Sequence, residues 1–157
     1  MDKGAGKHII KTLSNAKNYT HICSLYISEY YADAIKEMAL KHVPNRLITS
    51  TKQTERGFYP AEYLGEFATE VKRKGLPFQF LPVDNSFIYA EIYVADDTFA
   101  AIGSANLTKT GMWKSVEHIV TFDSPADIMN IKSDFERIRD YNTEGPAIRT
   151  RFKSRNG

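Results

Sequence analysis

The sequence of 157 residues contains a single cysteine and no long apolar segment. One thiol cannot form a disulfide within the chain, and no metal-ligand spacing accompanies it. No run of about 18 apolar residues is present, so the sequence predicts no membrane-spanning helix. The first ten residues, MDKGAGKHII, lack the apolar core of a signal peptide. Together these absences predict a cytoplasmic protein, with Cys23 as a buried and inert thiol.

A strong excess of either charge is also absent. The chain has 21 lysines and arginines against 19 aspartates and glutamates, a formal net charge of +2. This mild basic excess permits a polyanionic partner but does not require one. The length suits one domain with a substantial core. We expect this domain to span residues 1–148 and a basic tail to occupy residues 149–157.

Hydrophobic periodicity predicts strands that alternate with helices. Helices are expected at residues 7–17, 29–42, 63–74 and 126–141. Strands are expected at residues 20–28, 46–50, 77–83, 87–95, 99–102 and 117–122. Helix-end signals support these bounds: Ser28 as an N-cap, Gly75 after a basic last turn, and Ser124 followed by Pro125. The predicted fold class is an α/β sandwich that contains a parallel crossover.

The segment 87–106 has the most unusual pattern. In FIYAEIYVA, side chains of one parity share a face of the predicted strand. One face is apolar and suits a packed core, whereas the other carries Phe87, Tyr89, Glu91 and Tyr93. Asp96-Asp97-Thr98 predicts a turn, and the next short strand ends at the small polar loop Gly103-Ser104-Ala105-Asn106. A glutamate and two tyrosines therefore lie in a row beside a G-S-x-N loop.

This segment resembles the signature of the phospholipase D superfamily, which is H-x-K-x-x-x-x-D followed by G-S-x-N and a downstream acidic residue. By spacing, Tyr89 stands at the histidine, Glu91 at the lysine and Asp96 at the aspartate. Gly103, Ser104 and Asn106 match the second part, Glu117 matches the downstream acid, and Ser115 stands where many members carry asparagine. The resemblance implies a phospholipase D-like sandwich, with a central mixed sheet flanked by helices.

One motif copy in a short chain resembles the nuclease branch of the superfamily. In that branch two chains pair so that both motifs line one cleft, which implies a homodimer and a DNA or RNA partner. The family histidine attacks phosphorus, and the partner motif's histidine protonates the leaving oxygen. The lysine and the asparagine hold the phosphate oxygens.

Two substitutions remove the residues that perform this chemistry. The phenol of Tyr89 has an ordinary pKa near 10, so it is a poor nucleophile and a poorly matched acid near pH 7. Glu91 brings a negative charge to the position of a phosphate-binding cation. Two like charges about 4 Å apart repel by about 4 kcal/mol at an effective dielectric constant near 20. We therefore expect the family reaction to be absent or very slow.

Three functions remain open. The first is a non-catalytic paired scaffold that binds nucleic acid or another phosphodiester ligand without a cofactor. The second is an active phosphodiesterase with Tyr89 as its nucleophile. The third is a metal-assisted enzyme in which Glu91, Glu117 or Asp96 from two chains hold Mg²⁺ or Mn²⁺. The two substitutions favour the first.

Several basic residues are candidate nucleic-acid contacts. They are Lys52 and Arg56 in the loop 51–62, Lys109 and Lys114 beside the G-S-x-N loop, and Arg149 and Arg151 in the tail. The loop also carries Phe58 and Tyr59, and mixed basic and aromatic groups can hold phosphates and stack bases. The ordinary alternatives are solvated surface charges and aromatic rings that pack on the core.

Overall fold

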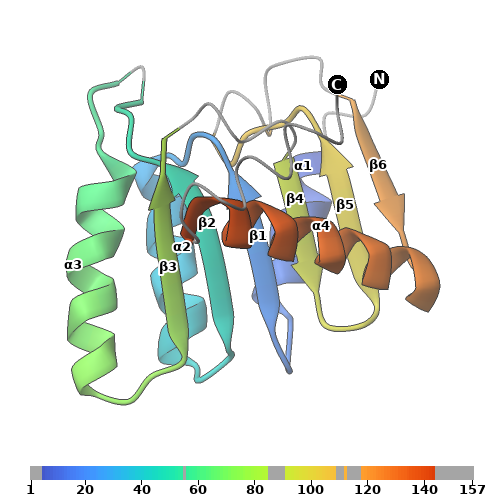
Figure 1. Ribbon diagram of the computed structural model, residues 1–157, viewed down its shortest axis with the longest axis horizontal. Helices are drawn as coiled ribbons and strands as arrows, with labels where there is room; N and C mark the ends of the chain where they lie inside the picture. The colour runs from blue at the N-terminus through green and yellow to red at the C-terminus, as the bar shows by residue number, and fades with distance from the viewer. Residues whose placement is uncertain (1–4, 55, 85–90, 109–111, 113–117, 144–157) are drawn as a thin grey trace.

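The computed structural model of the chain describes residues 5–54, 56–84, 91–108, 112 and 118–143 (Figure 1). The helices are α1 (Ala5–Ser14), α2 (Glu29–Leu40), α3 (Pro60–Arg73) and α4 (Pro125–Thr143). The strands are β1 (Thr20–Ser24), β2 (Asn45–Ser50), β3 (Phe78–Val83), β4 (Glu91–Ala95), β5 (Phe99–Gly103) and β6 (Ile119–Phe122). None of these helices combines the length and the apolar character that a membrane span requires.

The six strands form one mixed sheet in the order β3-β2-β1-β4-β5-β6. The β1–β2 and β2–β3 pairs are parallel, and the β1–β4, β4–β5 and β5–β6 pairs are antiparallel. One end of the sheet therefore gathers Ser24, Ser50, Val83, Glu91, Gly103 and Ile119. We call this end the motif edge; it lies at the top of Figure 1. The predicted α/β class and the parallel crossover from β1 through α2 to β2 are confirmed.

Helices cover both faces of the sheet. One core cluster joins residues of α1, α2 and α3 to Ile22, Leu47 and Tyr93 of the sheet. The second cluster joins Ile128, Ile131 and Phe135 of α4 to the opposite face. In Figure 1, α4 crosses in front of the strands. The result is a three-layer sandwich in which the central strands have no solvent-facing side.

Strand β4 shows this double burial most clearly. Ile92 and Val94 pack in the α4 layer, as the predicted apolar face requires. Tyr93, on the opposite face, is also buried, because that face lies under α1, α2 and α3. The part of the predicted strand before Glu91 lies outside the described residues.

Capping explains several element bounds. Gly75 adopts a positive φ of 69° after α3, and the N–H of Leu76 donates to the carbonyl of Val71 at 2.9 Å. This is the predicted glycine-ended helix. At the start of α4, the Ser124 hydroxyl accepts a hydrogen bond from the N–H of Asp127, also as predicted. Ser28 occupies the N-cap position of α2, but its hydroxyl makes no capping hydrogen bond.

Several predicted bounds were wrong, and the first helix, predicted at residues 7–17, spans Ala5–Ser14. Strand β1 ends at Ser24 and not at Ser28, because the next two backbone amides donate to side-chain acceptors and not to backbone carbonyls of the neighbouring strand. Helix α3 begins at Pro60, inside the predicted loop 51–62. Proline is compatible with the first turn of a helix, where its missing N–H would have had no partner within the helix.

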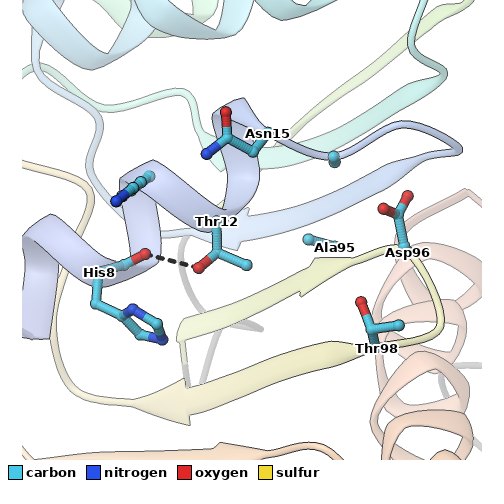
Figure 2. A pocket seen from close by; sticks show the side chains of 8 residues that line it. His8, Thr12, Asn15, Ala95, Asp96 and Thr98 are labelled. Carbon is cyan, nitrogen blue, oxygen red and sulfur yellow. Dashed lines mark hydrogen bonds between the residues drawn. The ribbon is translucent and has the colours of Figure 1, made fainter.

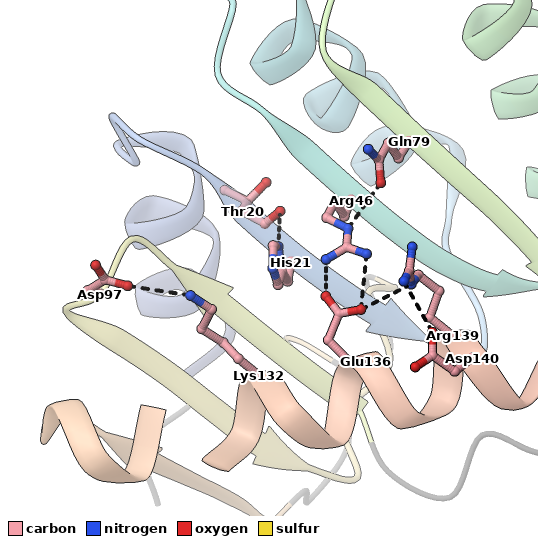
Figure 3. A network of polar contacts seen from close by, with 9 residues as sticks. All are labelled: Thr20, His21, Arg46, Gln79, Asp97, Lys132, Glu136, Arg139 and Asp140. Carbon is pink, nitrogen blue, oxygen red and sulfur yellow. Dashed lines mark hydrogen bonds and ion pairs between the residues drawn. The ribbon is translucent and has the colours of Figure 1, made fainter. Parts of the chain in front are cut away.

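Polar contacts dock α4 onto the sheet (Figure 3). Arg46 of β2 forms a two-pronged ion pair with Glu136 of α4, and its Nε donates to Gln79 of β3 at 3.1 Å. Beside this pair, the ring of His21 stacks on Phe135 with centroids 4.9 Å apart. The charges are thus satisfied where the helix crosses β1, β2 and β3.

The buried position of His21 predicts a pH dependence of stability. Burial lowers the pKa of His21 below its ordinary value of 6.5, and the positive charges of Arg46 and Lys132 act in the same direction. Because the folded state favours the neutral ring, its stabilisation is complete above about pH 6.5 and is lost as the pH falls toward the folded-state pKa. We expect the free energy of unfolding to fall by at most about 1.4 kcal/mol per pH unit in that interval.

Urea unfolding between about pH 7 and pH 5 measures this dependence. The variant His21→Phe should show a flatter profile, whereas His118→Gln, which alters an exposed histidine, should retain the wild-type slope. Equal slopes for the wild type and His21→Phe would contradict the assignment to His21.

Candidate functional site

The motif edge is where a ligand site is expected on structural grounds. In open α/β sheets, ligands bind outside the carboxyl ends of parallel strands. Here β1, β2 and β3 end at this edge, and the G-S-x-N loop leaves β5 beside them. The fold therefore gathers the two halves of the motif, Glu91 and the segment 103–106, at one edge.

Glu91 is the first residue of β4, and its side chain is nearly fully buried, with 5% exposed. Both carboxylate oxygens face the backbone N–H of Leu25, at 3.0 Å and 3.3 Å. This N–H belongs to the first residue after β1. The carboxylate therefore accepts the hydrogen bond that a backbone carbonyl would accept if the pairing of β1 with β4 continued. Charge-assisted hydrogen bonds of this kind are stronger than neutral ones.

The charge of Glu91 affects its buried neighbours. The pKa of Tyr93 is raised well above 10, first by burial and then by the Glu91 carboxylate. The pKa of the Cys23 thiol is raised by the same two causes in the same order. Both groups are therefore uncharged at neutral pH, and Cys23 is the inert buried thiol that the sequence predicts.

The loop 104–107 docks on the same end of β1. The side-chain carbonyl of Asn106 accepts a hydrogen bond from the N–H of Tyr26 at 3.2 Å, next to the amide held by Glu91. The buried hydroxyl of Tyr93 donates to the carbonyl of Ala105 at 2.6 Å. The N–H of Leu107 donates to the hydroxyl of Ser24 at 3.0 Å. Asn106 and Glu91 thus accept from consecutive amides, and this brings the two halves of the motif together.

Gly103 and Ser104 have local structural roles. A Cβ at Gly103 would lie 2.1 Å from the carbonyl oxygen of His118, so only glycine permits this approach of the last residue of β5 to the residue before β6. Ser104 and His118 exchange two hydrogen bonds: the N–H of Ser104 donates to the His118 carbonyl at 3.0 Å, and the His118 N–H donates to the Ser104 hydroxyl at 3.2 Å. The G-S pair therefore closes the β5–β6 connection.

Asp96 lies at the other end of β4 and does not join the residues at the motif edge. Its carboxylate accepts from the backbone N–H groups of Lys17, Asn18 and Tyr19, at 3.1, 2.7 and 3.1 Å. Asp96 also adopts a positive φ of 53° in the turn before β5. Its contacts are those of a structural acid that fixes the connection from α1 to β1.

A cavity of about 320 Å³ lies beside Asp96, between α1 and the β4–β5 turn. Figure 2 shows the side chains that line it, among them His8, Thr12, Asn15, Ala95, Asp96 and Thr98. It is separated from the motif edge by the length of β4. Asp96 is thus the one residue of the motif that lines this cavity among the described residues, and Glu91 and the segment 103–106 do not line it.

The remaining predicted site residues divide into two groups. Lys52 and Arg56 are exposed in the loop that follows β2 at the motif edge. Phe58 of that loop packs against the core, as the ordinary alternative predicts. The residues outside the described ranges are Tyr89, Lys109, Lys114, Ser115, Glu117, Arg149 and Arg151.

Sequence reasoning missed Ser24 and the amides of Leu25 and Tyr26, which receive the motif side chains. A signal was available, because Ser24 interrupts an apolar run in the predicted strand. Within the described ranges, no three His, Cys, Asp or Glu side chains gather closely enough to hold a metal ion. Glu117, which the metal hypothesis invokes, lies outside those ranges.

The family assignment comes from the chain as a whole. Residues 9–139 match the family model described as cardiolipin synthase, PLD-like domain. Because this match covers most of the chain, the protein belongs to the phospholipase D-like family. A comparison with curated proteins finds no match.

Solved structures share the fold of this chain. NucT from Helicobacter pylori matches with a TM-score of 0.69 and 17% identity, covering 88% of this chain and 89% of its own. Nuc from Salmonella typhimurium, a phospholipase D family member, matches with a TM-score of 0.68 and 14% identity, covering 90% of each chain. TrmBL2, an archaeal chromatin protein described with a novel mode of DNA binding, matches with a TM-score of 0.62 and 12% identity, covering 89% of this chain and 50% of its own. The chain therefore shares the fold of NucT and Nuc.

The contacts of Asp96 predict a structural effect of its substitution. Asp96→Ala leaves three amides without their acceptor and should lower the free energy of unfolding by about 2–4 kcal/mol. Asp96→Asn retains one carbonyl oxygen and tolerates the positive φ, so its loss should be smaller. Asp97→Ala is the control for loss of an exposed carboxylate: Asp97 accepts from the Tyr19 hydroxyl at 2.6 Å and pairs with Lys132 at 3.6 Å. Because these contacts lie at the surface, their loss should cost less than the loss of the three amide contacts. Urea unfolding that found Asp96→Ala as stable as the wild type would contradict this role.

Proposed function

We propose that this chain is a degenerate phospholipase D-like domain that binds nucleic acid or another phosphodiester ligand as a homodimer, with little or no hydrolysis. The observation that carries the proposal is the position of Glu91. Its carboxylate stands at the family's lysine and turns into the protein to accept from Leu25. A group held in this way is an anchor for the chain and supplies no positive charge to a phosphate.

The electrostatics of the motif edge support weak or absent catalysis. A phosphodiester at this edge would meet a carboxylate where the family reaction uses a cation, and two like charges at about 4 Å repel. Asn106 accepts from Tyr26 through its carbonyl oxygen, which leaves its amide group as a donor for a phosphate oxygen. Tyr89 stands two residues before Glu91 in the sequence. Its phenol replaces the family nucleophile with a much weaker one.

Binding is supported by the groups around the edge. Lys52 and Arg56 are exposed on the loop beside it, and basic side chains of this kind neutralise phosphates. Lys109, Lys114, Arg149 and Arg151 are further candidate contacts by sequence. The fold likeness to TrmBL2, a chromatin protein, is consistent with a domain of this shape serving DNA binding.

The homodimer follows from the single motif. The family reaction uses two motifs, and this chain carries one copy in a length close to that of NucT and Nuc. Two copies would place two Glu91 carboxylates near the shared cleft. The repulsion toward a bound phosphate would then come from both halves.

Nuclease and binding assays test the proposal together. Wild-type protein, Tyr89→Phe and Glu91→Gln are incubated with single-stranded and duplex DNA and RNA, with and without Mg²⁺ or Mn²⁺. We expect binding that weakens as salt rises, no cleavage in any condition, and a dimeric mass by sedimentation. Glu91→Gln retains a carbonyl acceptor for Leu25, so it removes the charge without removing the anchor.

Two results would contradict the absence of catalysis. Metal-independent cleavage that disappears in Tyr89→Phe would identify Tyr89 as a nucleophile. Metal-dependent cleavage that disappears in Glu91→Gln would identify a carboxylate metal site. Absence of binding to every nucleic acid and to other phosphodiesters would contradict the binding role itself.

A further inference from the structure

Two exposed tyrosines stand beside the motif edge on neighbouring helices. Tyr30 lies in the first turn of α2 with 60% of its surface exposed, and Tyr59 precedes α3 with 43% exposed. Both helices begin where a parallel strand has just ended, so both tyrosines lie at the motif edge. Among the described residues, they are the two aromatic members of the set of exposed large hydrophobic side chains.

Contacts between α2 and α3 place the two tyrosines at adjoining helix ends. The hydroxyl of Tyr63 on α3 donates a hydrogen bond to the carboxylate of Asp33 on α2. Tyr30 precedes Asp33 by three residues, and the carbonyl of Tyr59 accepts from the N–H of Tyr63 at 3.2 Å. Tyr30 therefore lies about one turn closer to the motif edge than Asp33, and Tyr59 lies about one turn closer than Tyr63. Since both helices run away from that edge, the two tyrosines lie at the same end of the α2–α3 pair.

The orientation of each ring is set by a neighbouring aromatic residue. Tyr30 packs edge-to-face on the buried ring of Tyr31, with centroids 5.1 Å apart. Phe58 turns inward, where its ring lies 5.3 Å from that of Tyr63. Tyr59 has extended backbone angles, φ −105° and ψ 91°, so its side chain points away from that of Phe58. The Tyr30 ring is thus supported by Tyr31 at the surface, and the exposed Tyr59 ring points away from the core contact of Phe58.

The charges nearby favour a ligand with both flat rings and phosphates. Lys52 and Arg56 are exposed on the loop that leads to Tyr59. This loop is closed by the hydrogen bonds from Thr54 N–H to the Phe58 carbonyl at 2.8 Å and from Gly57 N–H to the Thr54 carbonyl at 2.9 Å. Glu29 and Glu62 in the first turns of the two helices are exposed as well. A phosphate would therefore favour the loop, and a base would favour the tyrosines.

We propose that Tyr30 and Tyr59 form a stacking surface for unpaired nucleobases of a DNA or RNA strand whose phosphates contact Lys52 and Arg56. Aromatic rings beside a basic path are the usual means of holding single strands, because every base has a face that can stack. A duplex keeps those faces within its own stack, so it cannot use this surface. The inference rests on the proposed function and specifies the form of nucleic acid that the site takes.

Binding of short single-stranded DNA and RNA oligonucleotides, measured by fluorescence anisotropy beside a DNA duplex of the same sequence, tests this surface. Tyr30→Ala and Tyr59→Ala should each weaken single-strand binding about 5- to 50-fold, while Tyr30→Phe and Tyr59→Phe should bind as the wild type does. Leu40→Ala is the matched control, because Leu40 is 53% exposed at the opposite end of α2. The alanine variants should also keep the wild-type salt slope, whereas Lys52→Ala should reduce it.

The outcomes separate the two proposals. If single strands bind but the tyrosine-to-alanine variants match Leu40→Ala, the stacking surface is refuted and the binding function stands. Equal affinity for the duplex and the single strand would refute the role of unpaired bases. If no nucleic acid binds, the stacking surface is refuted, and the proposed function fails with it only if other phosphodiesters do not bind either. Thermal unfolding of each variant confirms that the comparison is made between folded proteins.

Discussion

The hydrogen bonds from the Leu25 amide to the Glu91 carboxylate hold the motif edge together. They attach the first residue beyond β1 to the first residue of β4, and Asn106 attaches the following amide to the G-S-x-N loop. A carboxylate that is 5% exposed must be satisfied by such donors, because burying a charge without them is costly. The residue that departs most sharply from the family's chemistry is therefore also a structural element of this chain.

Glu91 is the first residue of β4, and Asp96 directly follows its last residue. Both carboxylates accept hydrogen bonds from backbone N–H groups that flank β1. Asp96 accepts from the three amides that precede β1, and Glu91 accepts from the amide that follows it. The strand between them pairs antiparallel with β1 along its length. The two acids thus fix the central antiparallel pair of the sheet at opposite ends. Glu91 and Asp96 therefore both have structural roles that do not depend on catalysis.

The sequence was sufficient for the fold because its apolar patterns are strongly periodic. The residues that cap two helix ends, Gly75 and Ser124, were predicted, and the corresponding helix bounds were predicted to within one residue. The sequence did not predict which backbone groups the motif acids would contact, because those contacts depend on β1 and β4 being neighbours although they are far apart in the chain. The separation of Asp96 from Glu91 was predictable, since five strand residues span about 17 Å. The spacing of the motif residues in the sequence does not by itself indicate that these two acids lie at opposite ends of one strand.

The most direct measurement of the central claim is amide hydrogen exchange at Leu25 and Tyr26, resolved by NMR, in the wild type and in Glu91→Ala. If the Glu91 carboxylate anchors the chain, the Leu25 amide is protected in the wild type, although it lies outside any strand. In Glu91→Ala this amide exchanges rapidly while Ile22, within β1, stays protected. Rapid exchange of Leu25 in the wild type, or protection that survives the loss of the carboxylate, would contradict the account.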